Sequence, residues 1–294
     1  MQRCRIESLG VSLQPGPLFR RGSIDHAVRA GRACLKGSRY NPEDVRVLVN
    51  AGIHRDGHVC EPAIAAYIQR RLGINVEFQG RRTLAFDLQN GGCGMLNAAH
   101  VLSALLLSGE AQVGMVVASE ANSDRRPDPA YTYPPSGAAT LIDLSPREGV
   151  GFGAFAFHTH DEYSELYSSV VSLKVARGQL QLRRRGEELE EVYLSKARAV
   201  VDEVLEKDGL RREDVALVVP AQISQRFLEK LPEAIGFPKE RVASYTDRLA
   251  DTLSTSTFLA LHEAMKGPEC APGKTVVLLA FGSGVTIGAA SYTR

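Results

Sequence analysis

The alternation of strand-type and helix-type segments along both halves of this 294-residue chain constrains its fold more than any other feature. Short runs rich in Val, Ile and Leu are typical of buried strands, and longer segments with a period of about 3.6 residues are typical of helices. Strands that alternate with helices indicate an α/β protein, in which helices cover the faces of the sheets. We expect strands at 6–13, 45–49, 83–88, 112–118, 138–144, 151–159, 215–219, 275–280 and 285–292, and helices at 24–35, 61–72, 93–107, 187–206, 225–231 and 254–265.

The composition argues against several classes of protein. The 35 basic and 34 acidic residues leave a net charge of +1, so binding to nucleic acid through bulk charge is not expected. No apolar run approaches the roughly 20 residues that a membrane-spanning helix needs. Five cysteines without a CxxC spacing favour neither a disulfide framework nor a zinc site. We therefore expect a cytoplasmic protein with no membrane span, no metal and no nucleic-acid partner.

The turn between the strand at 83–88 and the helix at 93–107 carries the strongest chemical signal. Gly91 and Gly92 permit a tight turn, and Cys93 then opens an almost wholly apolar helix that we expect to be buried on all sides. A thiol at a helix N-terminus faces the positive end of the helix dipole, which lowers its pKa, and free N–H groups there can stabilise a thioester oxyanion. The alternative is a small buried hydrophobic residue beside a glycine turn.

Five stretches, taken in order, resemble the thiolase-fold condensing enzymes, specifically the ketoacyl-ACP synthase III family. They are residues 61–73, 86–94 (FDLQNGGCG), 217–224 (LVVPAQIS), 250–258 (ADTLSTSTF) and 281–290 (FGSGVTIGAA). The resemblance implies a five-layered αβαβα fold of two pseudo-symmetric halves, here residues 1–160 with the candidate nucleophile helix and residues 161–294. It also implies a dimer formed through a central strand, either a homodimer or a heterodimer with a ketosynthase paralogue.

The same resemblance places three substitutions at the family's Cys-His-Asn triad. Matching the motifs puts Gly92 at the cysteine, with Cys93 one residue later, Ala221 at the histidine and Asp251 at the asparagine. Asp251 brings a negative charge to the place where a malonate carboxylate must sit, which is unfavourable unless Asp251 is protonated or paired. Gln222 can donate a hydrogen bond from beside the lost histidine. Standard decarboxylative condensation is therefore not expected.

Glu61 has two interpretations. In this family the residue before the corresponding proline lies on a loop that reaches into the partner's acyl tunnel. A branch that joins two acyl chains head to head has Glu there, which resembles the base for a non-decarboxylative Claisen step. The other interpretation is an acidic residue in the first turn of a helix, where the dipole favours it.

Two more segments bear on the substrate. Gly282, Ser283 and Gly284 lie between the last two expected strands, where glycine lets the backbone approach the floor of a site. Together with Gly92 and Gly94 they are our candidates for oxyanion or acyl binding. The charge-rich residues 174–185 are interpreted as a solvated surface segment, with a basic patch for an acidic carrier protein as the alternative.

Two hypotheses follow for the function. In the first, the chain is a ketosynthase III-like acyltransferase of fatty-acid or polyketide-type secondary metabolism. Cys93 takes an acyl group from acyl-CoA or an acyl carrier protein, with no further cofactor, and Glu61, Gln222 and Asp251 position the second substrate. Since the segment at 14–23 is short and the chain has no Trp to clamp adenine, a carrier protein is the favoured donor. In the second, the chain is a non-catalytic subunit that dimerises with an active paralogue.

Overall fold

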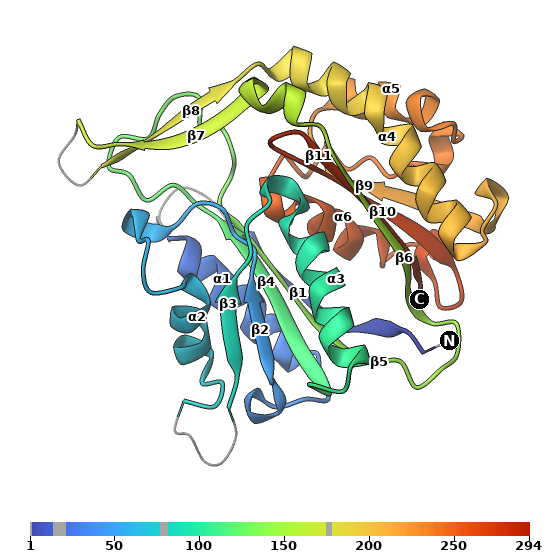
Figure 1. Cartoon of the computed structure of the whole chain (residues 1–294), viewed down its shortest axis with the longest axis horizontal. Coiled ribbons are helices and arrows are strands. Elements are labelled where there is room, and N and C mark those ends of the chain that lie inside the picture. The colour runs from blue at the N-terminus through green and yellow to red at the C-terminus, as the bar shows by residue number, and fades with distance from the viewer. Residues whose placement is uncertain (1, 14–21, 77–81, 175–177) are drawn as a thin grey trace.

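Two β-sheets with helices between and outside them form the framework of the computed structural model, which describes residues 2–13, 22–76, 82–174 and 178–294 (Figure 1). In the first sheet the strands lie in the order β1-β5-β4-β2-β3, and in the second in the order β6-β11-β10-β9. The first sheet comprises β1 (Cys4–Leu13), β2 (Val47–Asn50), β3 (Leu84–Asp87), β4 (Val113–Glu120) and β5 (Ser136–Leu144). The second comprises β6 (Gly151–Thr159), β9 (Val215–Pro220), β10 (Thr275–Gly282) and β11 (Thr286–Thr293).

The two sheets repeat one pattern of pairing. β1 and β5, and β5 and β4, pair antiparallel, whereas β4 and β2, and β2 and β3, pair parallel. The second sheet has the same order of pairings: β6–β11 and β11–β10 are antiparallel, and β10–β9 is parallel. A single parallel bridge between Val218 and Val242 stands where β3 stands in the first sheet. The predicted pseudo-symmetry of two halves is visible in this pattern.

The alternation of side chains along the strands explains the layers. Val47 and Val49 of β2 pack into the core between the sheets, while Leu48 packs into the core on the outer face of the first sheet. α3 (Gly94–Leu107) and α6 (Ser256–Ala264) lie in the central layer. α1 (Ser23–Lys36) and α2 (Ile64–Leu72) cover the first sheet, and α4 (Gly186–Asp208) and α5 (Gln225–Ile235) cover the second. The predicted five-layered αβαβα fold is confirmed.

The structure differs from the sequence-based expectations at α2, at α3 and at the boundary between the two sheets. α2 begins at Ile64 rather than at residue 61, because the Asp87 carboxylate accepts hydrogen bonds from the N–H groups of Ile64 and Ala65 and caps the helix there. α3 is not buried on all sides, since Val101 and Leu107 are exposed on one face. β6 lies within residues 1–160 yet pairs in the second sheet, so the boundary between the two sheets falls between residues 144 and 151.

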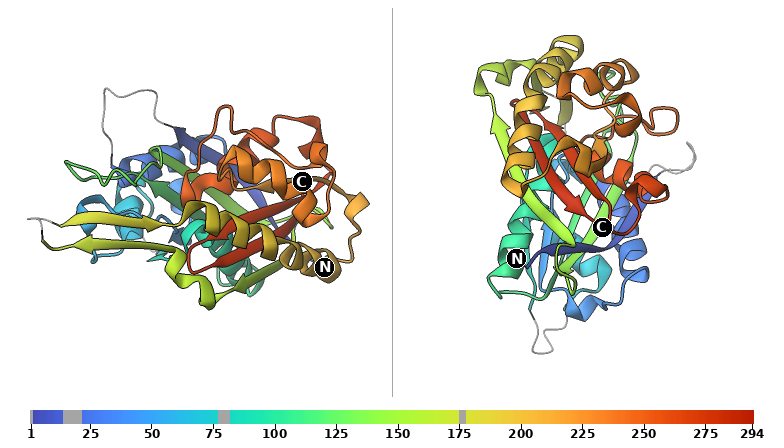
Figure 2. Two further views of the ribbon diagram at one scale, coloured as in Figure 1. Left: turned by 90° about the horizontal axis from the view of Figure 1, so that it is seen from above. Right: turned by 90° about the vertical axis from the view of Figure 1, so that its right-hand side faces the viewer.

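β7 (Tyr167–Ser172) and β8 (Gln179–Arg184) pair as a hairpin, and β8 lies within residues 174–185, which were expected to be a solvated surface segment. Figure 2 shows the hairpin projecting away from the two-sheet body. Leu180 and Leu182 are buried on one face of β8. Arg184 lies on the same face and is partly buried, whereas Arg183 on the opposite face is exposed. The surface interpretation of residues 174–185 is therefore wrong for Arg184.

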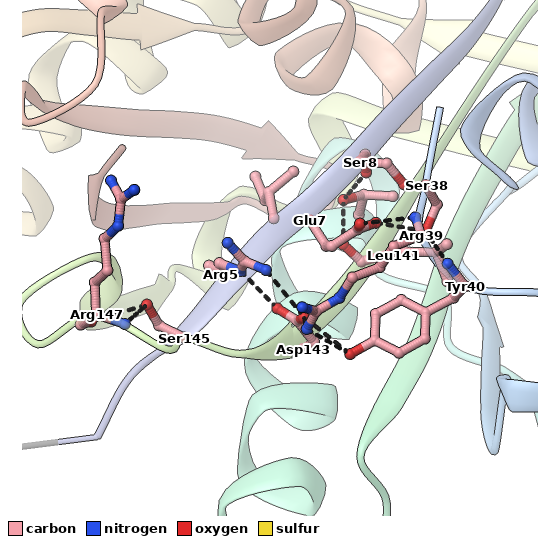
Figure 3. A network of polar contacts seen from close by, with 12 residues as sticks. Arg5, Glu7, Ser8, Ser38, Arg39, Tyr40, Leu141, Asp143, Ser145 and Arg147 are labelled. Carbon is pink, nitrogen blue, oxygen red and sulfur yellow. Dashed lines mark hydrogen bonds and ion pairs between the residues drawn. The ribbon is translucent and has the colours of Figure 1, made fainter. Parts of the chain in front are cut away.

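A buried carboxylate fastens the outer strand of the first sheet to the loop after α1 (Figure 3). Asp143 on β5 is 1% exposed and forms ion pairs with Arg5 on β1 at 2.9 Å and with Arg39 at 2.7 Å. The Tyr40 hydroxyl donates a hydrogen bond to the same carboxylate at 3.0 Å. Three charged or polar donors thus compensate for the burial of one acidic group.

Among the described residues, no helix is both long and apolar enough to cross a lipid bilayer.

Candidate active site

The glycine turn at the start of α3 is pressed against the loop between β10 and β11. Gly91 adopts a positive φ of 53°, which favours glycine. A Cβ on Gly92 would lie 2.0 Å from the carbonyl oxygen of Phe281, and a Cβ on Gly91 would lie 2.7 Å from the backbone nitrogen of Ser283. The two segments meet backbone to backbone, so a side chain at position 92 cannot be placed without moving β10.

Cys93 is the N-cap of α3, as the sequence predicts, but its thiol is not in an activating environment. The side chain is fully buried, and its Sγ donates to the carbonyl oxygen of Thr286 at 3.3 Å. Its backbone N–H already donates to Asn90. Burial raises the pKa of Cys93 to about 12. The expectation of a lowered pKa is therefore wrong, because the loss of hydration outweighs the helix dipole.

A cavity of about 30 Å³ brings together the three positions onto which the resemblance maps the triad. Gly92, Ala221 and Asp251 all line it, from the turn before α3, the end of β9 and the loop before α6. Ser283 lines it as well, whereas Cys93, Gly94, Gly282 and Gly284 do not. Among the residues that the structure describes, the lining of this cavity therefore includes neither a cysteine nor a histidine.

Asp251 is the one ionisable residue among the three. Burial raises its pKa to about 6, while the Arg184 guanidinium and a hydrogen bond from the N–H of Leu253 oppose the shift. The Arg184 Nη1 lies 3.7 Å from the Asp251 Oδ2, and the Leu253 N–H donates to Oδ1 at 2.9 Å. Leu253 itself has a positive φ of 51°, a costly conformation for a branched residue. In this conformation the Leu253 N–H donates to the carboxylate of Asp251, which lines the cavity.

Residues from the hairpin, from α4 and from the loop before β5 form another part of the cavity wall. Arg184 and Tyr167 come from β8 and β7, Tyr193 comes from α4, and Tyr133 comes from the loop before β5. The Arg184 Nη1 donates to the Tyr133 hydroxyl at 3.4 Å, and burial raises the pKa of Tyr133 to about 12. Sequence reasoning missed this set, although the period-two pattern of QLQLRR could have placed Arg184 on the buried face of a strand.

Glu120 is a further buried carboxylate that sequence reasoning missed. It ends β4 fully buried and accepts hydrogen bonds from the Ile53 N–H at 3.0 Å and from the Ser254 hydroxyl. The His54 Nδ1 lies 2.7 Å from the same carboxylate. An acidic residue at the end of a wholly buried strand was the available signal. Glu120 ties together two loops that carry the cavity-lining residues Ile53 and Leu253.

Gln222 does not take part in the cavity. Its amide nitrogen donates to the carbonyl oxygens of Pro220 and Ala243 at 2.9 and 3.3 Å, and its Oε1 accepts from the N–H of Tyr245 at 2.6 Å. The side chain is 1% exposed. The prediction that Gln222 donates near the lost histidine is wrong, because backbone groups already use its amide.

Glu61 lies outside the cavity of its own chain. It is exposed in the loop before α2 and is not in the first turn of that helix. Cys60 and neighbouring residues of this loop line a second, larger pocket of about 410 Å³, which extends toward Val171 and Leu180 of the hairpin. Ile53 lines both pockets.

Comparisons with known proteins agree with this architecture. A family model for the C-terminal part of 3-oxoacyl-[acyl-carrier-protein (ACP)] synthase III matches residues 205–294. β-Ketoacyl-ACP synthase III of Aquifex aeolicus is 26% identical over 273 residues, which are 90% of this chain and 81% of the relative. The same enzyme of Sodalis glossinidius is 30% identical over 239 residues, 78% of this chain and 71% of the relative. The crystal structure of the Thermus thermophilus synthase III superposes with a TM-score of 0.85 at 26% identity and covers 99% of both chains.

The family model matches the C-terminal part alone, whereas the Thermus thermophilus structure covers 99% of this chain. The chain belongs to the β-ketoacyl-ACP synthase III family of thiolase-fold condensing enzymes.

Proposed function

We propose that this chain is a non-catalytic ketosynthase III-like subunit, which dimerises with an active paralogue in cytoplasmic fatty-acid or polyketide-type biosynthesis. One observation carries the proposal: Gly92, Ala221 and Asp251, the three positions assigned to the triad, line a single small cavity that contains neither a thiol nor an imidazole. A Claisen condensation through a thioester needs a nucleophile and a group that stabilises the enolate. The cavity supplies neither in the family's arrangement.

Acylation of Cys93 is the weaker hypothesis. Burial raises the pKa of Cys93 far above neutral pH, so the thiol and not the thiolate is the form present at pH 7. The thiol faces the Thr286 carbonyl oxygen rather than the cavity, and the thiolate is the form that attacks a thioester. An acyl group on this sulfur would also require space in a core where the side chain is fully buried.

An edge of the first sheet supports a role as a subunit. β3 pairs only with β2 among the described strands, and Leu84 at its start is 56% exposed. An open strand edge with an exposed apolar side chain is a template for pairing with another chain. Glu61 is exposed in the loop before α2, the helix that packs beside this strand. In a dimer formed along β3, we expect Glu61 to reach the acyl site of the partner.

The proposal is tested by co-expressing this chain, with an affinity tag, and a ketosynthase III paralogue that has an intact Cys-His-Asn triad. We expect a one-to-one complex that forms a β-ketoacyl product from acyl-CoA or acyl-ACP donors. Replacing the paralogue's nucleophilic cysteine should abolish the product, and Cys93→Ala should leave it unchanged. Leu84→Lys should dissociate the complex, while Leu13→Lys, at the opposite edge of the same sheet and 42% exposed, should not. Condensation by this chain in the absence of a paralogue would contradict the proposal.

A further inference from the structure

A histidine and a carboxylate meet beside the pocket of about 410 Å³. β2 and β4 pair in parallel, so the loop that carries His54 after β2 passes Glu120 at the end of β4. The His54 Nδ1 donates to the Glu120 carboxylate at 2.7 Å, and Tyr131 packs against the imidazole in a T-shaped contact with ring centroids 4.9 Å apart. The Glu120 carboxylate therefore fixes the tautomer of His54 and leaves Nε2 as an acceptor.

Ser169 lies on the other side of this imidazole. Alternate residues of β7 share a face, and Ser169 and Val171 both line the pocket. The Ser169 Oγ lies 3.4 Å from the His54 Nε2. The Leu180 N–H of β8 donates to Asp124 at 2.9 Å, which fastens the hairpin to the loop after β4. A hydroxyl, an imidazole and a carboxylate in this order activate a serine as a nucleophile, and the first contact is often loose until substrate binds.

Asn122 brings an unused donor to the same pocket. Its Oδ1 accepts from the backbone N–H of Asp124 at 2.8 Å, which sets the orientation of the amide. Its Nδ2 is buried and has no hydrogen-bond partner in the described part of the chain, although Asn122 lines the pocket. A buried donor without an acceptor is costly, so it points to an acceptor that arrives with a ligand. Side-chain amides of this kind stabilise the oxyanion formed in acyl transfer.

The pocket sets the class of substrate. Its volume is in the range of small-molecule sites, and its apolar lining comes from Ile53, Val59, Ala121, Val171 and Leu180. The cations that line it are already paired. Arg55 contacts Asp87 at 3.0 Å and His58 contacts Asp124 at 2.7 Å. A neutral ester with a short acyl chain suits such a lining, whereas the phosphate-bearing arm of a coenzyme A or carrier-protein thioester does not.

We propose that this pocket is an esterase site separate from the replaced condensation triad, with Ser169 as nucleophile, His54 as general base, Asn122 as oxyanion donor and Glu120 as a positioning residue. The Ser169 Oγ attacks the ester carbonyl carbon while its proton passes to the His54 Nε2. The carbonyl oxygen becomes an oxyanion that accepts from the Asn122 amide. The ester C–O bond then breaks, and the leaving alcohol takes the proton from His54.

Water completes the reaction. It attacks the acyl-Ser169 ester, gives one proton to His54 and releases the carboxylic acid, and His54 returns that proton to the Ser169 oxygen. The sum is one ester and one water converted to one acid and one alcohol, without a cofactor. All four residues belong to this chain, so the site can be tested without a paralogue and independently of the proposed role in a dimer.

Two probes test the site on the purified full chain. An alkyl fluorophosphonate should add once, with loss of fluoride, and peptide mapping should place the adduct on Ser169. p-Nitrophenyl acetate should be hydrolysed with saturation kinetics. Ser169→Ala should abolish the adduct and lower kcat/KM at least about 100-fold. Ser168→Ala, on the opposite face of β7, is the matched control and should change neither result.

Three further variants separate catalysis from folding. His54→Gln should abolish the adduct while the melting temperature shows that the chain is folded. Asn122→Ala should lower kcat about 100-fold or more with KM nearly unchanged, because the oxyanion forms only in the transition state. Glu120→Gln should also lower kcat rather than raise KM, since it releases the tautomer of His54.

The outcomes that would overturn the inference are equally defined. They are the absence of a fluorophosphonate adduct on the folded parent chain, an adduct on a residue other than Ser169, and ester hydrolysis at the parent rate by folded Ser169→Ala. None of these results would bear on whether the chain forms a complex with a paralogue.

Discussion

Putting a cysteine back at the position that the family resemblance assigns to the nucleophile should destabilise the protein rather than activate it. In Gly92→Cys the new Cβ would lie 2.0 Å from the carbonyl oxygen of Phe281 and 3.1 Å from its carbonyl carbon. Side-chain carbons rarely approach a heavy atom closer than 3.0 Å, so one of the two backbones must move by about 1 Å. Phe281 pairs with Ile287 in the central part of the second sheet, and the Tyr193 hydroxyl donates to the carbonyl of the next residue at 3.0 Å. That backbone cannot move freely.

The magnitude follows from this overlap. Forcing extra atoms into a packed core costs about 1–3 kcal/mol, and a clash with a paired strand belongs at the upper end. At about 2.1 cal/mol/K per residue, the unfolding entropy of 294 residues is about 0.6 kcal/mol/K, so a loss of 3 kcal/mol lowers the melting temperature by about 5 °C. Differential scanning calorimetry measures this shift directly.

Gly37→Ala is the matched control. Gly37 caps α1 with a φ of −83°, and a Cβ there meets its nearest neighbour at an ordinary 3.6 Å. Because alanine restricts the unfolded chain, this change should be neutral or stabilise by about 0.4–1 kcal/mol. If Gly92→Cys melts within 1 °C of the parent protein, the backbone contact between Gly92 and Phe281 is not rigid, and the predicted steric clash does not exist.

Three further predictions concern ionisable groups. Iodoacetamide at pH 8 should alkylate the exposed Cys60 and leave the buried Cys93 unmodified until the protein unfolds, as peptide mass mapping would show. Because the pKa of Asp251 rises from its ordinary 3.8 to about 6 on folding, its contribution to stability falls as the pH rises through this range. Asp251→Asn should therefore increase the free energy of unfolding by up to about 3 kcal/mol at pH 7 and leave it unchanged at pH 3.5. A larger increase at pH 3.5 than at pH 7 would show that the pKa of Asp251 is not raised by folding. Asp143→Asn should cost about 2–3 kcal/mol in urea unfolding because it removes the shared partner of two arginines, whereas the exposed Asp214→Asn should cost less than about 0.5 kcal/mol.

The layered fold and most of its elements could be predicted from the sequence, because period-two and period-3.6 patterns are local properties. The strand at residues 151–159 was predicted with the bounds it has, and most other strand and helix ends differ by one to four residues. The start of α2 could not be predicted from its own residues, since the group that caps it, Asp87, lies 23 residues further along the chain. Helix ends depend on such tertiary partners.

The site could be predicted in part. The motifs placed Gly92, Ala221 and Asp251 in one site, because the fold of the family carries their positions. The environment of Cys93 and the hydrogen bonds of Gln222 could not be predicted, since both depend on burial by segments distant in sequence. The inward turn of Arg184 was hidden by the neighbouring arginines, which gave a charge-rich segment the appearance of a solvated surface.

The most direct test of the central claim is intact-mass spectrometry of the purified chain after incubation with a panel of acyl-CoA and acyl-carrier-protein thioesters. A non-catalytic subunit should carry no acyl adduct, so the parent and Cys93→Ala should both keep their unmodified masses. With an active paralogue present, the adduct should appear on the paralogue alone. An acyl adduct on this chain that disappears in Cys93→Ala would instead establish Cys93 as a nucleophile and rule out a purely non-catalytic role.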